Sequence, residues 1–118
     1  MQQNELVIGV DLGASNVRAA LVKNGEILQI AKSPLPKDKS YSGVLNTIFS
    51  VIDQVHQVGV IGIGVGVPSV VNRKDGIVYN VQNIPTWIEV PLKQILQERY
   101  NCVVQVNNDA NCFALGEC

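Results

Sequence analysis

The sequence has few charged side chains and no excess of either sign. Charged residues make up 16% of its 118 residues, and the formal net charge is −1. A protein that binds nucleic acid needs a basic surface to neutralise phosphates, so the composition argues against nucleic acid as a partner. Apolar residues make up 47%, a fraction too high for a disordered segment, and we expect one packed domain.

The sequence has no apolar run long enough to cross a membrane. Its longest uncharged apolar stretch, residues 58–71, is rich in glycine and contains Pro68, whereas a membrane helix needs about 20 residues. The first residues, MQQNE, lack the positively charged start of a signal peptide. We therefore expect a cytoplasmic protein that has no membrane partner.

Residues that bind transition metals are also scarce. The three cysteines, Cys102, Cys112 and Cys118, form no CxxC pair, so reduced thiols are a better interpretation than disulfides or a zinc site. The single histidine, His56, has no second histidine with which to share a metal and is interpreted as structural.

Three patterns near the N-terminus predict three consecutive strands. An apolar run at residues 6–10 ends at Asp11, as expected for a buried strand. The segments 17–23 and 26–32 flank Asn24-Gly25. Asn-Gly between two strand patterns indicates a hairpin, because a type I′ turn requires positive φ at both residues.

Two helices are predicted further along the chain. Residues 33–39 contain two prolines and are expected to form a loop, after which Ser40 or Ser42 can cap an amphipathic helix. Pro91 is well placed at the start of a second, shorter helix. The apolar positions at helical spacing are Val44, Leu45, Ile48, Val51, Ile52 and Val55 in the first helix, and Leu92, Ile95, Leu96 and Tyr100 in the second.

A glycine-rich strand is predicted at residues 60–67, and a last strand at 102–106. Glycine occupies three of the four even positions of the first of these. One face of that strand is therefore bare and lets another group approach the backbone closely. A dinucleotide-binding fingerprint is rejected, because the spacing is GxGxG and Pro68 follows where a helix should begin. A short hairpin is expected around residues 70–79.

The order β-β-β-α-β-α-β predicts a mixed α/β sheet, since right-handed crossovers make strands one, four and five parallel neighbours. Ligands of such sheets bind beyond the carboxyl ends of the strands. Asp11, the segment Gly66-Val67-Pro68 and the pair Asn108-Asp109 follow those ends. We expect all three to lie at one edge of the sheet.

The first candidate site is the segment Asp11-Leu12-Gly13-Ala14-Ser15-Asn16. Gly13 permits a tight turn out of the strand. The loop amides and the Ser15 hydroxyl can face a phosphate, and Asp11 can hold Mg²⁺ directly or through water. An ordinary turn between strands fits the same residues equally well.

Two further segments are candidates, each with a structural alternative. The Asp109 carboxylate beside Asn108 can accept a proton from a hydroxyl, although either residue could simply cap the next helix. In Asn83-Ile84-Pro85-Thr86-Trp87, an amide near an indole suits a sugar. A loop whose tryptophan packs on the core is the simpler interpretation of that stretch.

Three motifs together carry a family resemblance. IGVDLGASNVRAALV resembles the first phosphate motif of the superfamily of sugar kinases, heat-shock proteins and actin. IGIGVGVPSVVNRKDGIVYNVQNIPTW and VNNDANCFALGE resemble the ROK family, which comprises sugar kinases of the bacterial glucokinase type and related repressors. The first motif is specific only to the superfamily, whereas the three in this order are specific to the family.

The resemblance implies an actin-like ATPase, ribonuclease H-like fold, with a five-stranded sheet of order 3-2-1-4-5 in each of two lobes. Residues 1–118 would form the N-terminal lobe, and the C-terminal lobe would be absent from this chain. The chain alone is then expected to be inactive. The intact protein is expected to bind ATP, Mg²⁺ and a hexose and to form homo-oligomers.

The resemblance also implies roles for individual residues. Asp109 would be the base that activates the attacking hydroxyl, and Asp11 would lie at the metal. The residues implied at the phosphates are Asp11, Gly13, Ser15 and Asn16, and those implied at the sugar are Gly66, Pro68, Asn83, Asn108 and Asp109.

The chain departs from the family pattern at several positions. Where the family usually reads DLGGTK, this chain has Ala14, Ser15 and Asn16 in place of Gly, Thr and Lys. Ser15 keeps the hydroxyl, but Ala14 puts a methyl group near the phosphate path. Ser69 replaces a glycine after Pro68. The family's C-terminal histidine and cysteine-rich zinc motif are not found in the 118 residues.

The sequence therefore favours the N-terminal lobe of an ATP-dependent hexose kinase of the glucokinase type. The alternative is the sugar-sensing domain of a ROK repressor. Such repressors carry a winged helix before the first strand, which here begins by about residue 5. That position and the presence of Asp109 favour the kinase. A third hypothesis is an inert domain that keeps only the fold, and Ala14 is its best support.

Overall fold

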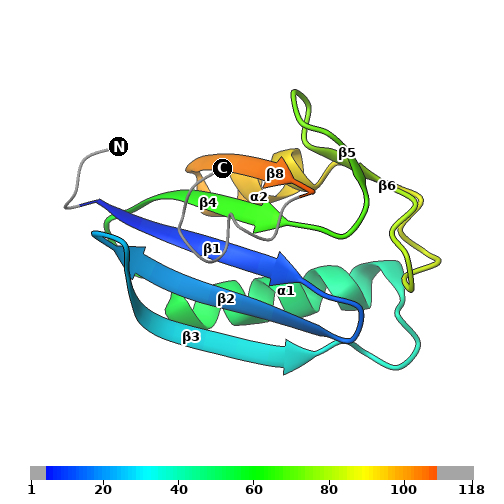
Figure 1. Cartoon of the computed structure of the whole chain (residues 1–118), viewed down its shortest axis with the longest axis horizontal. Helices are drawn as coiled ribbons and strands as arrows, with labels where there is room; N and C mark the ends of the chain where they lie inside the picture. Colours follow the sequence, from blue (N-terminus) through cyan, green and yellow to red (C-terminus); the bar gives the residue numbers. More distant parts are fainter. Residues whose placement is uncertain (1–4, 109–118) are drawn as a thin grey trace.

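The computed structural model describes residues 5–108 and contains a central five-stranded sheet of order β3-β2-β1-β4-β8 (Figure 1). Because β8 is the fifth strand of that sheet, the predicted order 3-2-1-4-5 is confirmed. The strands of this sheet are β1 Leu6–Leu12, β2 Asn16–Lys23, β3 Glu26–Pro34, β4 Val60–Gly66 and β8 Val103–Asn107, and the helices are α1 Tyr41–Val55 and α2 Leu92–Tyr100.

The first three strands form the predicted antiparallel ribbon, and β4 and β8 extend it in parallel. β1 pairs antiparallel with β2 and parallel with β4, and β4 pairs parallel with β8. Asn24 and Gly25 have φ values of 56° and 77°, as a type I′ turn requires. The carboxyl ends of β1, β4 and β8 therefore lie at one edge of the sheet.

Both helices cover the same face of the sheet, as Figure 1 shows, because both crossovers are right-handed and proceed in the same direction. The six predicted apolar positions of α1 are all buried. They pack on the inward side chains of the strands in one core, which also contains Trp87, Leu92 and Leu96. Ser40 caps α1, since its hydroxyl oxygen accepts a hydrogen bond from the Gly43 amide at 3.2 Å.

A small second sheet of order β5-β6-β7 stands beside the main one. Its strands are β5 Val70–Asn72, β6 Ile77–Tyr79 and β7 Glu89–Val90. The β5–β6 hairpin was predicted, but β7 was not, because a two-residue strand has too little sequence pattern to be recognised. The loop between β6 and β7 is closed by two backbone bonds, from Asn80 N to Ile88 O at 2.9 Å and from Val81 N to Trp87 O at 3.0 Å.

Among the described residues, no helix has the length and apolar character needed to span a membrane.

Candidate functional site

Three strand ends meet in one row at the carboxyl edge of the sheet. Asp11 of β1 is paired with Gly66 of β4, and Gly66 is paired with Asn107 of β8. A backbone hydrogen bond from Val67 N to Asn107 O, 2.9 Å long, continues this pairing beyond β4. Asn108 directly follows Asn107. The predicted meeting of Asp11, the segment 66–68 and Asn108 at one edge of the sheet is therefore present. Asp109, the predicted base, lies outside residues 5–108.

The turn between β1 and β2 is closed by a hydrogen bond from Gly13 N to Asn16 O at 2.8 Å. A Cβ atom at residue 13 would lie 3.1 Å from that same oxygen, so glycine permits the close approach of the two strands. Ala14, Ser15 and Asn16 are exposed at the tip. The turn therefore presents a hydroxyl and an amide side chain to solvent, as the phosphate-facing hypothesis requires.

A hollow of about 360 Å³ adjoins this turn and contains charges of both signs. An Arg18 guanidinium nitrogen lies 3.2 Å from a carboxylate oxygen of Asp11, and both side chains are partly exposed. An exposed ion pair of this kind contributes at most about 1 kcal/mol to stability. The residues that line the hollow are Asp11, Gly13, Ala14, Ser15, Asn16, Arg18 and Lys32.

The donor set fits magnesium held through phosphates better than a metal held by protein alone. Within residues 5–108, no group of three or more His, Cys, Asp or Glu side chains could hold a metal ion. Mg²⁺ usually keeps several waters and takes one or two carboxylates together with substrate phosphates. A single carboxylate, Asp11, beside exposed amides and a hydroxyl is consistent with that mode of binding.

The predicted sugar-facing residues lie in three separate loops at the same edge. Pro68, Asn83 and Asn108 are exposed, whereas Gly66 is buried within β4. Asn83 has φ of 70°, a conformation that asparagine tolerates better than most residues. In the bend after Pro68, the hydroxyl oxygen of Ser69 is buried and has no hydrogen-bond partner among residues 5–108.

Asn107 belongs to the polar trio that follows the last predicted strand, but no individual role was predicted for it, and it shapes the site. It is a buried polar residue, 9% exposed, and its side-chain oxygen accepts a hydrogen bond from the Asn108 amide at 2.8 Å. Such bonds from asparagine to the following backbone stabilise turns. Asn107 thereby fixes the Asn108 amide at the end of β8. A polar residue directly after an apolar run is the sequence signal that could have identified it.

Trp87 does not form part of an exposed sugar platform. Its side chain is fully buried, its indole nitrogen donates a hydrogen bond to the Tyr41 carbonyl at 3.3 Å, and the two rings lie 6.3 Å apart. The structural alternative weighed for this loop, a tryptophan packed on the core, is therefore correct. Asn83 and Thr86 remain exposed in the same loop.

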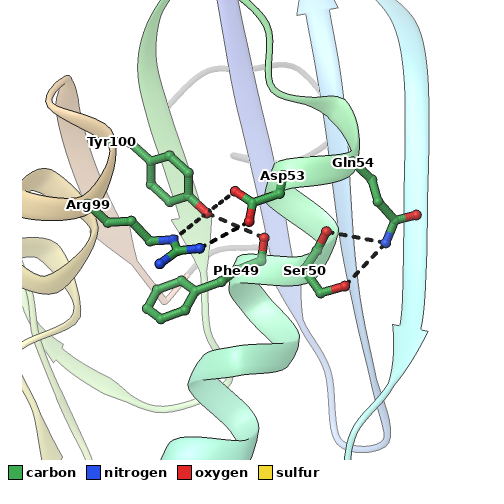
Figure 2. A network of polar contacts seen from close by, with 6 residues as sticks. All are labelled: Phe49, Ser50, Asp53, Gln54, Arg99 and Tyr100. Carbon is green, nitrogen blue, oxygen red and sulfur yellow. Dashed lines mark hydrogen bonds and ion pairs between the residues drawn. The ribbon is translucent and has the colours of Figure 1, made fainter.

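A second polar cluster joins the two helices, away from the carboxyl edge. Figure 2 shows Asp53 of α1 bonded to the Tyr100 hydroxyl at 2.8 Å and to the Arg99 guanidinium at 3.1 Å. The guanidinium also lies 4.2 Å from the centre of the Phe49 ring. Burial raises the pKa of Tyr100 above its usual value, and the hydrogen bond to Asp53 raises that pKa further. All of these polar groups are partnered, so we interpret the cluster as a structural tie between α1 and α2.

The fold and the position of the site define the class of the protein. The sheet combines a ribbon of three antiparallel strands with two parallel strands, in the order 3-2-1-4-5, and its polar loops lie at the carboxyl edge. This is the N-terminal architecture of actin-like ATPases. The chain belongs to the ROK family, whose family model matches residues 7–118.

Named relatives include both kinases and repressors. The chain is 36% identical to a glucokinase of Streptomyces coelicolor over 115 residues, which are 95% of this chain and 35% of that protein. It is 32% identical to a xylose repressor of Caldicellulosiruptor bescii over 120 residues, covering 94% of this chain and 29% of that protein. The chain thus spans about a third of the length of these relatives.

A solved structure supports the same assignment. The fold resembles a ROK family glucokinase from Streptomyces griseus in complex with glucose and AMPPNP, with a TM-score of 0.78 and 30% identity. The likeness covers 95% of this chain and 38% of the glucokinase chain.

Proposed function

We propose that this chain is the N-terminal lobe of an ATP-dependent hexose kinase, with glucose or a related hexose as its substrate. The observation that carries this proposal is the row Asp11–Gly66–Asn107, since it brings the turn after β1 and Asn108 to one edge of the sheet. The similarity to glucokinases over nearly the whole chain supports it. As part of the same proposal, the protein is cytoplasmic and forms homo-oligomers when intact.

In this proposal, the turn after β1 positions the phosphate chain. The exposed Ser15 hydroxyl and Asn16 amide donate hydrogen bonds to phosphate oxygens, and Gly13 lets the backbone come close. Asp11, which is paired with Arg18, would hold a magnesium ion directly or through water. A bound ion would neutralise part of the negative charge on the transferred group. Asp11→Ala should therefore weaken both turnover and the dependence of turnover on Mg²⁺.

The sugar end of the site is formed by the other loops. Asn108 and Asn83 hydrogen-bond sugar hydroxyls and orient them, while the backbone around Gly66 and Pro68 forms the wall. Asp109 accepts the proton of the attacking hydroxyl as its oxygen bonds to the γ-phosphorus and the bond from phosphorus to the leaving oxygen of ADP breaks. Such a base contributes about 10²–10⁴-fold to the rate.

A ROK repressor is the second candidate, because a xylose repressor matches the chain about as well as the glucokinases do. In that case the sugar-facing loops would bind an inducer and no phosphate would be transferred. We place the kinase first because the turn presents the Ser15 hydroxyl and the Asn16 amide to solvent, as binding of a phosphate there would require.

The deciding experiment expresses the gene from its complete reading frame and incubates the product with Mg-ATP and a panel of hexoses. A kinase gives a sugar phosphate, and the Asp11→Ala variant gives much less. Sugar binding without any sugar phosphate, together with specific retention of operator DNA, would instead establish the repressor. The 118-residue chain alone should give no sugar phosphate, because in-line transfer requires phosphates and sugar to be held together by both lobes.

A further inference from the structure

Lys39 has an unusual backbone conformation at the carboxyl edge. It lies in the loop between β3 and α1, directly before the helix cap Ser40, and its φ is 47°. A residue with a Cβ atom adopts this left-handed region only at a cost in free energy, so the surrounding structure must hold it there.

Three hydrogen bonds hold Lys39, and two of them lead to the proposed site. Its amide donates to the Pro36 carbonyl at 3.0 Å, which closes the local turn. Its side-chain ammonium donates to the Ala14 carbonyl at 3.3 Å, in the turn after β1. Its own carbonyl accepts from the Thr86 hydroxyl at 2.7 Å, in the loop that carries Asn83.

The loop between β3 and α1 makes a second contact with the turn after β1, since the Leu35 amide donates a hydrogen bond to the Ser15 carbonyl at 2.8 Å. The segment before α1 is therefore fixed on the turn through Leu35, and Lys39 reaches from that fixed segment to the β6–β7 loop. Ala14 and Thr86, which are far apart in the sequence, are therefore linked through Lys39, whose ammonium group bonds to one and whose carbonyl bonds to the other.

We propose that Lys39 is a positioning residue that ties the turn at residues 13–16 to the loop at residues 80–88, so that these two segments keep a fixed relative position. The inference rests on the proposed function, which assigns the turn to the phosphates and the loop to the sugar. The ammonium group of Lys39 also adds a positive charge beside the turn, which favours an anion there.

The coupling can be measured in the 118-residue chain by amide hydrogen exchange. Thr86→Val removes the hydroxyl donor and keeps the side-chain shape. No hydrogen bond joins Thr86 to the turn after β1 in the described part of the chain, yet two bonded amides there should respond, those of Gly13 and Leu35. Their exchange should speed up by roughly twofold to fivefold, the effect of losing one exposed polar contact. Unchanged exchange at both amides would overturn the proposal.

A double-mutant comparison tests whether the coupling passes through Lys39. Lys39→Gly relaxes the left-handed backbone and removes the ammonium group, so the melting temperature should not fall, although exchange at the Gly13 and Leu35 amides should rise. In that background, Thr86→Val should add nothing further at those amides. Additive effects, or a Lys39→Gly variant whose only change is a lower melting temperature, would contradict a positioning role.

The matched control is Lys37→Met, because Lys37 lies in the same loop and is exposed. It makes the same change of charge as Lys39→Met without touching the turn. Exchange at the Gly13 and Leu35 amides should respond to Lys39→Met and not to Lys37→Met. An equal response to both would show a general effect of charge and overturn the proposal.

A titration with inorganic tripolyphosphate separates this inference from the proposed function. If the chain binds tripolyphosphate, Lys39→Met should weaken the affinity by roughly twofold to fivefold, and Lys39→Arg should restore it. Equal affinity in both variants and the parent would contradict the role of the ammonium. If the parent binds no tripolyphosphate, the phosphate assignment of the turn fails, and the exchange measurements still decide the role of Lys39.

Discussion

The polar residues at the carboxyl edge differ from the polar cluster between α1 and α2 in how their side chains are partnered. In the cluster, Asp53, Arg99 and Tyr100 bond to one another at 2.8–3.2 Å. At the edge, the side chains of Ser15 and Asn108 are exposed and make no hydrogen bond within residues 5–108. A polar group satisfied by the protein contributes to stability, whereas a solvated one is available to a ligand at little cost. Substitutions should therefore affect stability in the cluster and binding or turnover at the edge.

Asp109→Asn in an active protein from the complete reading frame gives the largest effect that we expect. An amide keeps the shape of the side chain but cannot accept the proton, so turnover should fall by roughly two to four orders of magnitude. Sugar affinity and melting temperature should change far less. If Asp109 only caps a helix, asparagine would replace it with almost no loss, and near-parental turnover would remove it from the catalytic site.

Trp87→Ala should produce the largest loss of stability. The side chain is fully buried in the core, and truncation of a buried tryptophan costs about 3–5 kcal/mol. Chemical denaturation of the chain measures this loss. Trp87→Phe serves as the control, since it keeps an aromatic ring and should lose less stability without changing sugar affinity. A Trp87→Phe variant that keeps its stability but loses sugar would return this residue to the site.

Tyr100→Phe should lower stability by about 1 kcal/mol, because Asp53 loses a hydrogen-bond donor at a partly exposed position. Tyr79→Phe is the matched control, since Tyr79 makes no side-chain hydrogen bond in the described part of the chain. The raised pKa of Tyr100 also sets a pH dependence. The native state favours protonated tyrosine, so this contribution is complete below pH of about 10, the unperturbed value, and is lost as the pH rises above it. Tyr100→Phe should flatten that alkaline decline, and an unchanged slope would contradict the assignment.

Ser69→Ala should have the smallest effect on stability, and unlike the preceding substitutions it should raise stability. The Ser69 hydroxyl oxygen is buried and has no partner in the described part of the chain, and an unsatisfied buried polar group costs free energy. Its removal should raise the free energy of unfolding by about 1 kcal/mol or less. Denaturation of the chain with and without a sugar tests this expectation. A fall in stability would mean that the hydroxyl has a partner in solution.

The sheet was predictable because its strands have strong local patterns. The pair Asn24-Gly25 is enough to specify the hairpin turn. The row from Asp11 to Asn107 follows from the strand order and the right-handed crossovers. The α1 core positions follow from their helical spacing. In contrast, the strand β7 and the role of Lys39 depend on contacts between segments that are distant in the sequence, such as the bond from Thr86 to Lys39. The indole of Trp87 suited both a sugar and a core, and only tertiary packing decides between them.

The hairpin turn at Asn24-Gly25 offers an attachment point for probes. It connects β2 to β3 at the end of the sheet opposite Asp11, and a Cβ atom added at Gly25 would meet nothing within 4 Å. Exposed turn tips of this kind tolerate inserted residues. A short peptide tag or a dye-bearing cysteine loop placed there would report on ligand binding from a distance, without occupying the edge that we assign to ATP and sugar.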